Sequence, residues 1–359
     1  MQSVLRAIQA HPKLQLQLVV TGMHLSNKHG NSIEQVRGQG WKIDAAVPWQ
    51  AGPVAIATGL ATAELAKTFE KLKPDVVLVV GDRVEPMAAA IAAHLSGFAL
   101  AHVHGGDRAL GQVDDCLRHA ISKLAHLHFP ATLKSANRLK KMGEDAWRIH
   151  RVGSPGIDGI HQDAASDSKL SEEFPGLLKE QYALLVLHPV EANDSIEQRH
   201  AAMVARALRQ AGINQIVAIY PNNDPGHSGI IRAWEQLAKD RRFTLRKNVS
   251  REIYLGLLRR CILLAGNSSS GIIEAASFAT AVIDIGPRQS GRERAASVVH
   301  VNYDRREIIS AAAKIIAKPA KKLRTGKNIY GSGRSGNKIA EILAKTRLSE
   351  HLLRKIISY

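Results

Sequence analysis

Short apolar segments alternate with helical patterns along most of this chain. Near-continuous apolar runs fall at residues 14–22, 75–82, 99–106, 182–190, 215–224, 243–248 and 281–286, and one more precedes Gly266. Helical patterns lie between them, at 55–72, 86–97, 114–127, 195–212, 230–240 and 251–261. Strands that are apolar on both faces, separated by helices, are typical of a parallel sheet covered on both sides. The chain is therefore predicted to have an α/β fold.

The alternation stops at residues 153–176, a segment rich in Gly, Ser, Asp and Pro, and then resumes. We expect two α/β domains that face each other across a cleft, at residues 1–160 and 177–335. Residues 336–359 are predicted to form one or two helices that pack back on the N-terminal domain. The chain opens with a helical pattern at residues 2–11, whereas a domain of this type normally starts with a strand.

The composition is that of a globular protein, with 45 % hydrophobic and 23 % charged residues. No apolar stretch approaches the roughly 20 residues that cross a bilayer, and the first residues do not resemble a signal peptide. The two cysteines, Cys116 and Cys261, cannot form a disulfide framework and lack the spacing of zinc ligands. These features favour a cytoplasmic enzyme that does not use a membrane partner.

The formal net charge of +17 raises the question of a nucleic-acid partner. Lysine and arginine are spread along the whole chain, and aromatic residues make up only 4 %, too few for base-stacking platforms. A pocket for a phosphorylated small molecule on a basic surface explains the charge as well. We therefore expect no nucleic-acid partner.

Residues 261–278, CILLAGNSSSGIIEAASF, place glycines and hydroxyls between an apolar strand and a helix. In parallel sheets, ligands bind beyond the carboxyl ends of strands, where helix N-termini favour anions. Gly266 and Gly271 would let the backbone approach a ligand, and Ser268–Ser270 would donate hydroxyls. This pattern predicts a diphosphate site without a Walker lysine, with Glu274 placed to hold sugar hydroxyls. An ordinary serine-capped helix is the alternative.

Further polar residues follow other predicted strands. They are Asp82, Arg83 and Glu85 after the strand at 75–82, His104, Asp107, Asp114 and Asp115 after the strand at 99–106, and His188 in the second domain. Carboxylates and a histidine at such a site suit general acid–base chemistry. Asp82 could instead cap the next helix, and Arg118 and His119 could be structural or could face a substrate. The histidines at 102–128 lack a recognised metal-ligand spacing, so no metal is expected.

The chain resembles the UDP-N-acetylglucosamine 2-epimerases, and in particular their hydrolysing branch. The resemblance spans roughly residues 3–345 and rests on motifs that are individually weak but occur in the family's order. They are TGMHLS (21–26), GDRVEPMAAA (81–90), HVHGGD (102–107), DDCLRHAISKLAHLHF (114–129), VGSPGID (152–158), LHPV (187–190), YPNNDPG (220–226), GNSSSGIIEA (266–275) and GPRQSGRERAASV (286–298).

This resemblance implies two Rossmann-like domains of the glycosyltransferase-B type, a UDP-sugar in the interdomain cleft, no cofactor, and a homo-oligomer such as a dimer or tetramer. In the family's reaction, a base removes the proton on carbon 2 of the sugar while UDP leaves from carbon 1. Water then adds to the resulting glycal, which releases N-acetylmannosamine and UDP.

The resemblance also implies roles for individual residues. Asp82, Asp107 and one of Asp114 or Asp115 would be the acid–base carboxylates, and His188 would assist the departing phosphate. Ser268, Ser269 and Ser270 would hold the diphosphate, Glu274 the ribose, and Arg292 would face the nucleotide. The remaining substrate-binding residues implied are Arg83, Glu85, His104, Arg118, His119, Asn222, Asn267 and Gly271.

The chain departs from the family pattern in three places. Asp107 stands where the family has Glu, and Glu191 follows HPV where the family has Thr. The family's first strand and its Gly-Thr-Arg loop have no counterpart, so we expect the N-terminal sheet to lack that strand. Either translation begins upstream of Met1, or this protein is a shortened relative of the family. A related 2,4-diacetamido-trideoxy sugar nucleotide remains a possible substrate. A non-hydrolysing epimerase and a catalytically impaired UDP-sugar-binding protein remain alternative functions.

Overall fold

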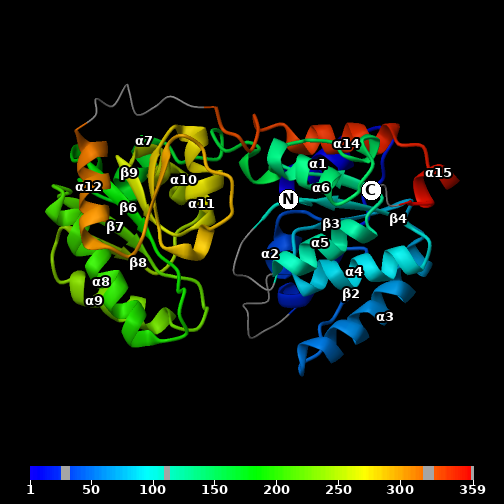
Figure 1. Cartoon of the computed structure of the whole chain (residues 1–359), viewed down its shortest axis with the longest axis horizontal. Helices are drawn as coiled ribbons and strands as arrows, with labels where there is room; N and C mark the ends of the chain where they lie inside the picture. The colour runs from blue at the N-terminus through cyan, green and yellow to red at the C-terminus, as the bar shows by residue number, and fades with distance from the viewer. Residues whose placement is uncertain (26–32, 109–113, 318–326, 357–359) are drawn as a thin grey trace. The chain divides into compact units, whose positions relative to one another are not determined.

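The structure, a computed structural model, describes residues 1–25, 33–108, 114–317 and 327–356 and divides into two compact units. Unit 1 comprises Met1–Arg108, Gln112–Pro155 and Arg334–Tyr359. Unit 2 is built mainly from Gly156–Gly333. Figure 1 shows strands and helices in both units, so the prediction of an α/β fold is confirmed.

Unit 2 contains a six-stranded parallel sheet in the order β11-β10-β9-β6-β7-β8. The order is that of a doubly wound sheet, in which the chain moves outward from β6 in one direction and then, starting with β9, in the other. Its strands are β6 (Tyr182–Val186), β7 (Gln215–Ile219), β8 (Phe243–Arg246), β9 (Leu263–Gly266), β10 (Ala281–Ile285) and β11 (Val298–Val301).

Helices cover the apolar strands of this sheet (Figure 1). Several begin at side-chain caps: the Asn193 side chain accepts from the backbone of α8, and Ser250 accepts from that of α10. The main core of unit 2 lies between the sheet and α8, α9 and α12. The helices are α7 (Asp167–Glu173), α8 (Asp194–Gln210), α9 (His227–Leu237), α10 (Arg251–Arg260), α11 (Ser269–Ile273) and α12 (Arg305–Ile316), with short 3-10 turns η5 (Leu177–Lys179), η6 (Ala275–Phe278) and η7 (Pro287–Gln289).

The strands of unit 1 form two separate parallel groups. One pairs β1 (Val19–Thr21) with β2 (Ala45–Val47), and the other has the order β3-β4-β5, made of Val76–Val80, Ala99–Val103 and Leu127–Phe129. Among the described residues, no strand joins β1 to β3. Strands β1 and β3 nevertheless contribute to one apolar cluster, since Val19 of β1 packs against the core that contains Val77 and Val79 of β3.

Helices lie on both faces of β3-β4-β5. One face packs against α3 (Val54–Leu72), α4 (Val84–Leu95) and α5 (Asp114–Leu124). The other face packs against α1 (Gln2–Ala10) and α14 (Ser335–Lys345). The remaining elements of the unit are η1 (Gly22–Leu25), α2 (Ile33–Gly38), α6 (Leu133–Lys141), η3 (Ala146–Arg148), η4 (Pro155–Ile157), which runs into unit 2, and α15 (Glu350–Leu353).

The C-terminal segment belongs to the same unit as the N-terminus. Figure 1 shows α14, in orange, beside the blue α1. A Cβ at Gly336 would lie 2.7 Å from the carbonyl carbon of Ser3, so only glycine allows the two helices to approach this closely. Leu352 of α15 is also buried in this cluster. The chain's last helices therefore complete the core that its first helix begins.

Candidate active-site residues

In unit 2, the strand order reverses between β6 and β9, and the candidate residues follow these two strands. His188 lies just beyond β6, and Asn267 follows Gly266 at the end of β9. Gly266 has a φ of +133°, and a Cβ there would overlap the carbonyl oxygen of Val186. This glycine lets the two strand ends lie side by side, at the position where doubly wound sheets bind ligands.

Asn267 joins the two strand ends. Its fully buried side chain accepts a hydrogen bond from the His188 N–H at 2.7 Å and donates one to the His188 carbonyl at 2.8 Å. A third hydrogen bond, 3.3 Å long, runs from the Asn267 amide to the Tyr303 hydroxyl. In this structure the Asn267 amide therefore fixes the backbone of His188.

The protonation of His188 follows from its surroundings. Burial, together with the nearby positive charge of Arg288, lowers the pKa of His188 to about 4, so the ring is neutral near pH 7. The Asn222 N–H donates to Nδ1 at 3.1 Å. Nδ1 must then be the unprotonated nitrogen, and Nε2 carries the hydrogen. His188 can thus donate one hydrogen bond through Nε2.

The serine-rich segment forms the start of α11. Ser268 is the N-cap, and its hydroxyl accepts from the Ser270 N–H at 3.3 Å. The Ser270 hydroxyl accepts from the Tyr254 hydroxyl at 2.7 Å, which leaves the hydrogen of Ser270 available to another acceptor. The serine-capped helix and the anion site predicted from the sequence are therefore compatible.

Gly271 allows α11 to pack closely on the sheet. A Cβ at this position would lie 2.9 Å from Leu264 Cδ2 and 3.0 Å from Val282 Cγ1. Glu274, at the end of α11, pairs with Arg251 at 2.8 Å. The Nε atom of Arg292 and the Oδ1 atom of Asn222 are buried, and neither has a hydrogen-bond partner among the described residues.

In unit 1, Asp82 follows β3 and pairs with Arg118 of α5. The Arg118 side chain is 5 % exposed and that of Asp82 is 21 % exposed, so the carboxylate is the member of the pair that solvent reaches more easily. Arg118 also approaches the carbonyl of His104 at 3.4 Å. The pair links the end of β3 to α5 and to the end of β4.

His104 and Asp107 follow β4 and contact each other. His104 Nδ1 lies 2.9 Å from Asp107 Oδ2, the Ser135 hydroxyl donates to Asp107 Oδ1 at 2.7 Å, and Ser154 Oγ lies 3.3 Å from His104 Nε2. His104 has a φ of +66°, a left-handed conformation that is uncommon for a residue with a side chain. Such strained backbone is found most often at functional sites.

Two further pairs in unit 1 involve candidate residues. On α5, His119 Nε2 is 3.8 Å from Asp115 Oδ2, and burial lowers the pKa of His119 although Asp115 opposes the shift. At the start of α4, Arg83 Nε is 3.3 Å from Glu85 Oε2. Gly22 contacts Glu85 so closely that a Cβ at Gly22 would overlap it. The side chain of Asp114 lies outside the part of the chain that the structure describes.

His102 is a buried structural residue. Its Nε2 lies 2.8 Å from the Gly81 carbonyl and its Nδ1 lies 3.1 Å from Ser122 Oγ, and burial lowers its pKa to about 3. The described residues contain no group of three or more His, Cys, Asp or Glu side chains that could hold a metal ion. They also contain no helix that is both long enough and apolar enough to span a membrane.

Several residues in these networks were not identified from the sequence. Ser135, Ser154 and Tyr254 contact candidate residues that are distant in the sequence. No motif includes Ser135 or Tyr254, and Ser154 lies in the VGSPGID segment but was not assigned a role. Glu197 is fully buried and accepts hydrogen bonds from the N–H groups of Val190 and Glu191, so it shapes the loop after His188. The sequence did hold a signal for Glu197, because it is a carboxylate on the otherwise apolar face of the helical pattern at 195–212.

Comparisons with known proteins agree with this geometry. Residues 6–344 match the family model described as UDP-N-acetylglucosamine 2-epimerase. A Legionella pneumophila protein named UDP-N,N'-diacetylbacillosamine 2-epimerase (hydrolyzing) is 35 % identical to this chain. The match covers 100 % of this chain and 96 % of the Legionella protein. A Neisseria meningitidis UDP-N-acetylglucosamine 2-epimerase is 33 % identical over 87 % of this chain and 82 % of its own.

Solved structures show the same fold. The crystal structure of Neisseria meningitidis UDP-GlcNAc 2-epimerase bound to UDP-GlcNAc has a TM-score of 0.81 and 20 % sequence identity, and it covers 96 % of this chain and 97 % of the solved chain. A family model that matches almost the whole chain, and relatives above 30 % identity, determine the assignment. This chain belongs to the UDP-N-acetylglucosamine 2-epimerase family.

Proposed function

We propose that this protein is a hydrolysing 2-epimerase that converts a UDP-2-acetamido sugar and water to the free 2-epimeric sugar and UDP. The observation that carries the proposal is the placement of His188 and Ser268–Ser270 beyond β6 and β9, where the strand order of unit 2 reverses. Membership of the epimerase family and the name of the Legionella relative, a hydrolyzing enzyme, support this reaction.

We assign UDP to unit 2. The hydroxyl of Ser270 and the Nε2–H of His188 are donors that suit the diphosphate, and the unpartnered Nε of Arg292 suits the nucleotide. A neutral His188 that donates through Nε2 stabilises the negative charge that develops on the leaving diphosphate. Bound diphosphate would in turn favour protonation of the ring. We assign Glu274 to the ribose hydroxyls.

We assign the acid–base chemistry to unit 1. Asp107 is held by His104 and Ser135, and Asp82 is held by Arg118, so each carboxylate has a defined orientation. One carboxylate removes the proton on carbon 2 while the bond from carbon 1 to the UDP oxygen breaks. A second carboxylic acid then returns a proton to the opposite face of carbon 2 as water adds to carbon 1. Asp115 is the third candidate for these two roles.

The reaction can be tested by following UDP-N-acetylglucosamine with the purified protein by NMR in D₂O. We expect UDP and free N-acetylmannosamine, with deuterium at carbon 2 because the new proton comes from solvent. A mixture of two UDP-sugars would instead identify a non-hydrolysing epimerase. If the protein binds UDP in calorimetry but releases none from either N-acetylated sugar nucleotide, it is a binding protein.

The same assay identifies the sugar. The substrates to compare are UDP-N-acetylglucosamine and UDP-2,4-diacetamido-2,4,6-trideoxyglucose. The Neisseria relative is named for the first sugar nucleotide and the Legionella relative for the second, and each match covers most of this chain. We propose the diacetamido sugar as the better substrate, since the Legionella relative covers the whole chain. A higher kcat/KM for UDP-N-acetylglucosamine would reverse this order.

A further inference from the structure

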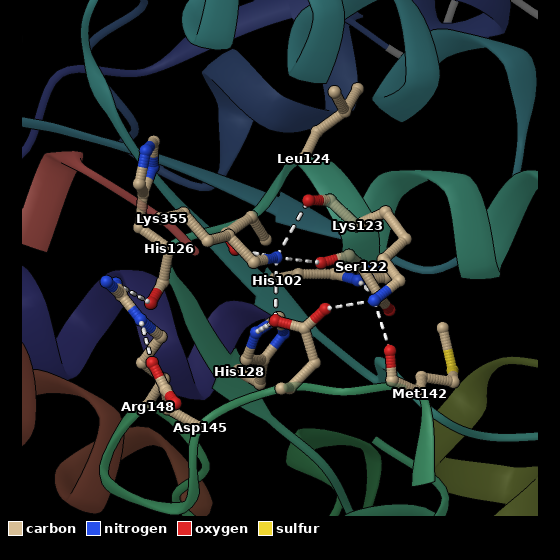
Figure 2. Close-up of polar contacts among 12 residues, drawn as sticks. His102, Ser122, Lys123, Leu124, His126, His128, Met142, Asp145, Arg148 and Lys355 are labelled. Atoms are coloured by element: carbon tan, nitrogen blue, oxygen red, sulfur yellow. Dashed lines mark hydrogen bonds and ion pairs between the residues drawn. The ribbon is translucent and has the colours of Figure 1, made fainter. Parts of the chain in front are cut away.

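The C-terminal segment carries a buried lysine at the end of α5, the helix that bears Asp115, Arg118 and His119. Lys355 Nζ donates to the carbonyls of Ser122 at 3.1 Å, Lys123 at 2.7 Å and Ala125 at 2.8 Å (Figure 2). The last carbonyls of a helix have no partner within the helix. Two of these carbonyls, those of Ser122 and Lys123, lie in the last turn of α5, and that of Ala125 follows it directly. The ammonium group shares its three hydrogens among these acceptors and complements the negative end of the α5 dipole.

A buried carboxylate holds this lysine in place. Glu144 Oε2 lies 2.6 Å from Lys355 Nζ and 2.9 Å from His128 Nε2, and Glu144 Oε1 lies 3.2 Å from Lys123 Nζ. The side chains of Glu144 and Lys355 are 0 % and 6 % exposed. Burial alone would raise the pKa of Glu144, but the hydrogen bonds from His128 and Lys355 outweigh it and lower the pKa to about 2.

An arginine fixes the C-terminal segment that carries Lys355. Arg148, almost fully buried, donates to the carbonyls of Leu352 at 2.8 Å and His351 at 3.0 Å. It also donates to the carbonyl of His126 at 3.2 Å, and Figure 2 shows it beside the Lys355 cluster. The position of Lys355 is therefore set by two buried charged residues, Glu144 and Arg148.

A series of contacts connects the C-terminal end of α5 to the candidate catalytic residues. Ser122 Oγ lies 3.1 Å from both the Arg118 carbonyl and His102 Nδ1, and His102 Nε2 contacts the Gly81 carbonyl next to Asp82. Arg118 in turn pairs with Asp82. A shift of the last turn of α5 would therefore reach the carboxylate at the end of β3 through contacts that are all present in the structure.

We propose that Lys355 is a positioning residue for the epimerase reaction, which fixes α5 from its C-terminal end so that Arg118 and Asp115 are correctly placed. This inference rests on the proposed function, and the contacts given above for Lys355 are to Glu144 and to backbone carbonyls. It assigns a role to a C-terminal residue that no motif marks. The role differs from simple stabilisation because it predicts a loss of kcat in protein that is still folded.

Lys355→Met tests the proposal. We expect kcat to fall about 10- to 100-fold, because small displacements of reacting groups have effects of this size. The KM and the Kd for UDP should change less than twofold, because the UDP site is assigned to unit 2. Amide hydrogen exchange across α5 should become at least about tenfold faster, while α8 in unit 2 stays unchanged. The matched control is Lys345→Met, which removes an exposed lysine of the same segment.

A second variant separates positioning from stability. Lys355→Met alone takes from the buried Glu144 its closest cationic partner, at 2.6 Å, so it should lower the Tm. The double variant with Glu144→Gln removes that less well compensated charge but still leaves the α5 carbonyls without the lysine. We expect the double variant to recover Tm but not kcat. If Lys355→Met fails to fold, the double variant alone provides the test.

Three results would overturn the proposal: wild-type kcat in folded Lys355→Met, recovery of kcat together with Tm in the double variant, or unchanged hydrogen exchange in α5. Failure of the proposed function is a separate outcome. In that case the wild-type protein releases no UDP from either sugar nucleotide, whereas the exchange experiment still reports whether Lys355 holds α5.

Discussion

At the scale of single residues, polar side chains in both units are held by specific partners. Asp107 is oriented by His104 and Ser135, and His188 is oriented through its backbone by Asn267. Such contacts fix where a proton can be taken or given before any substrate arrives. Two of our predictions concern these residues.

Asp107→Asn should lower kcat by about 100-fold or more, because the amide keeps the shape of the carboxylate but cannot accept a proton. The Kd for UDP should stay within twofold of wild type. Steady-state UDP release and calorimetry measure the two quantities. Asp75→Asn is the matched control, since Asp75 is exposed just before β3, at the end of the strand opposite to Asp82. Unchanged turnover in Asp107→Asn would exclude Asp107 from the acid–base steps.

His188 should make the protein less stable as the pH falls. Its pKa is about 4 when folded and near 6.5 when unfolded, so between these values the unfolded chain binds more protons. The contribution to stability is complete above pH 6.5 and is lost as the pH falls toward 4. The free energy of unfolding, measured with urea, should fall between pH 7 and pH 5 in both proteins. The fall should be about 2 kcal/mol smaller in His188→Asn than in wild type. Equal drops would mean that His188 titrates normally in the folded protein.

At the scale of elements, the longer helices and most of the buried strands could be predicted from apolar periodicity. The helix predicted at 55–72 is α3, Val54–Leu72, and the strand predicted at 75–82 is β3, Val76–Val80. The helix predicted at 114–127 instead ends at Leu124, and Leu127 begins β5. The strand predicted at 14–22 is limited to Val19–Thr21.

Other elements were not predicted at all. Strands β2 and β5 have three residues each, too few for a periodic pattern, and exist because neighbouring strands pair with them. Strand β11 is also short, and its pairing partner is β10. Helices α6, α7 and α12 were likewise missed. Strands of three or four residues depend on tertiary contacts more than on local propensity.

Two glycines give opposite predictions at this scale. Gly266→Ala should prevent stable folding of unit 2, because the new Cβ would overlap the Val186 carbonyl and the φ of +133° is unsuitable for alanine. Gly59→Ala should instead raise the free energy of unfolding by about 0.5–1 kcal/mol, because Gly59 is exposed inside α3 with open space around it. Circular dichroism and urea unfolding of both variants provide the measurement. A stable, UDP-binding Gly266→Ala protein would contradict the close approach of β6 and β9.

At the scale of the whole molecule, the chain leaves unit 1 after Pro155, forms unit 2, and returns to unit 1 at Arg334. The returning segment supplies Ile339, Ala340 and Leu352 to a core that also contains Val4 and Ile8. Because each fully buried leucine or isoleucine stabilises a fold by about 1.5–3 kcal/mol, the last helices are an integral part of unit 1.

Truncation after Thr346 should therefore loosen unit 1 and leave unit 2 folded. The deletion removes Leu352 and Lys355, so hydrogen exchange should increase in α1 and α5 while β6 and β9 stay protected. Binding of UDP should persist, whereas its release from a UDP-sugar should be lost. Mass spectrometry of hydrogen exchange, with calorimetry of UDP, tests these outcomes. Equal protection of α5 in both proteins would show that the C-terminal segment is dispensable for that helix.

By itself, the sequence determined the α/β class, the alternation of strands and helices, and the residues that follow the ends of the strands. These features are local, since apolar periodicity and the φ that only glycine adopts are properties of neighbouring residues. Only the tertiary structure decided that Ser135 holds Asp107, that Asn267 holds His188, and that Lys355 caps α5. Each of these contacts joins segments far apart in the chain, and which distant groups meet depends on how the elements pack rather than on any local pattern.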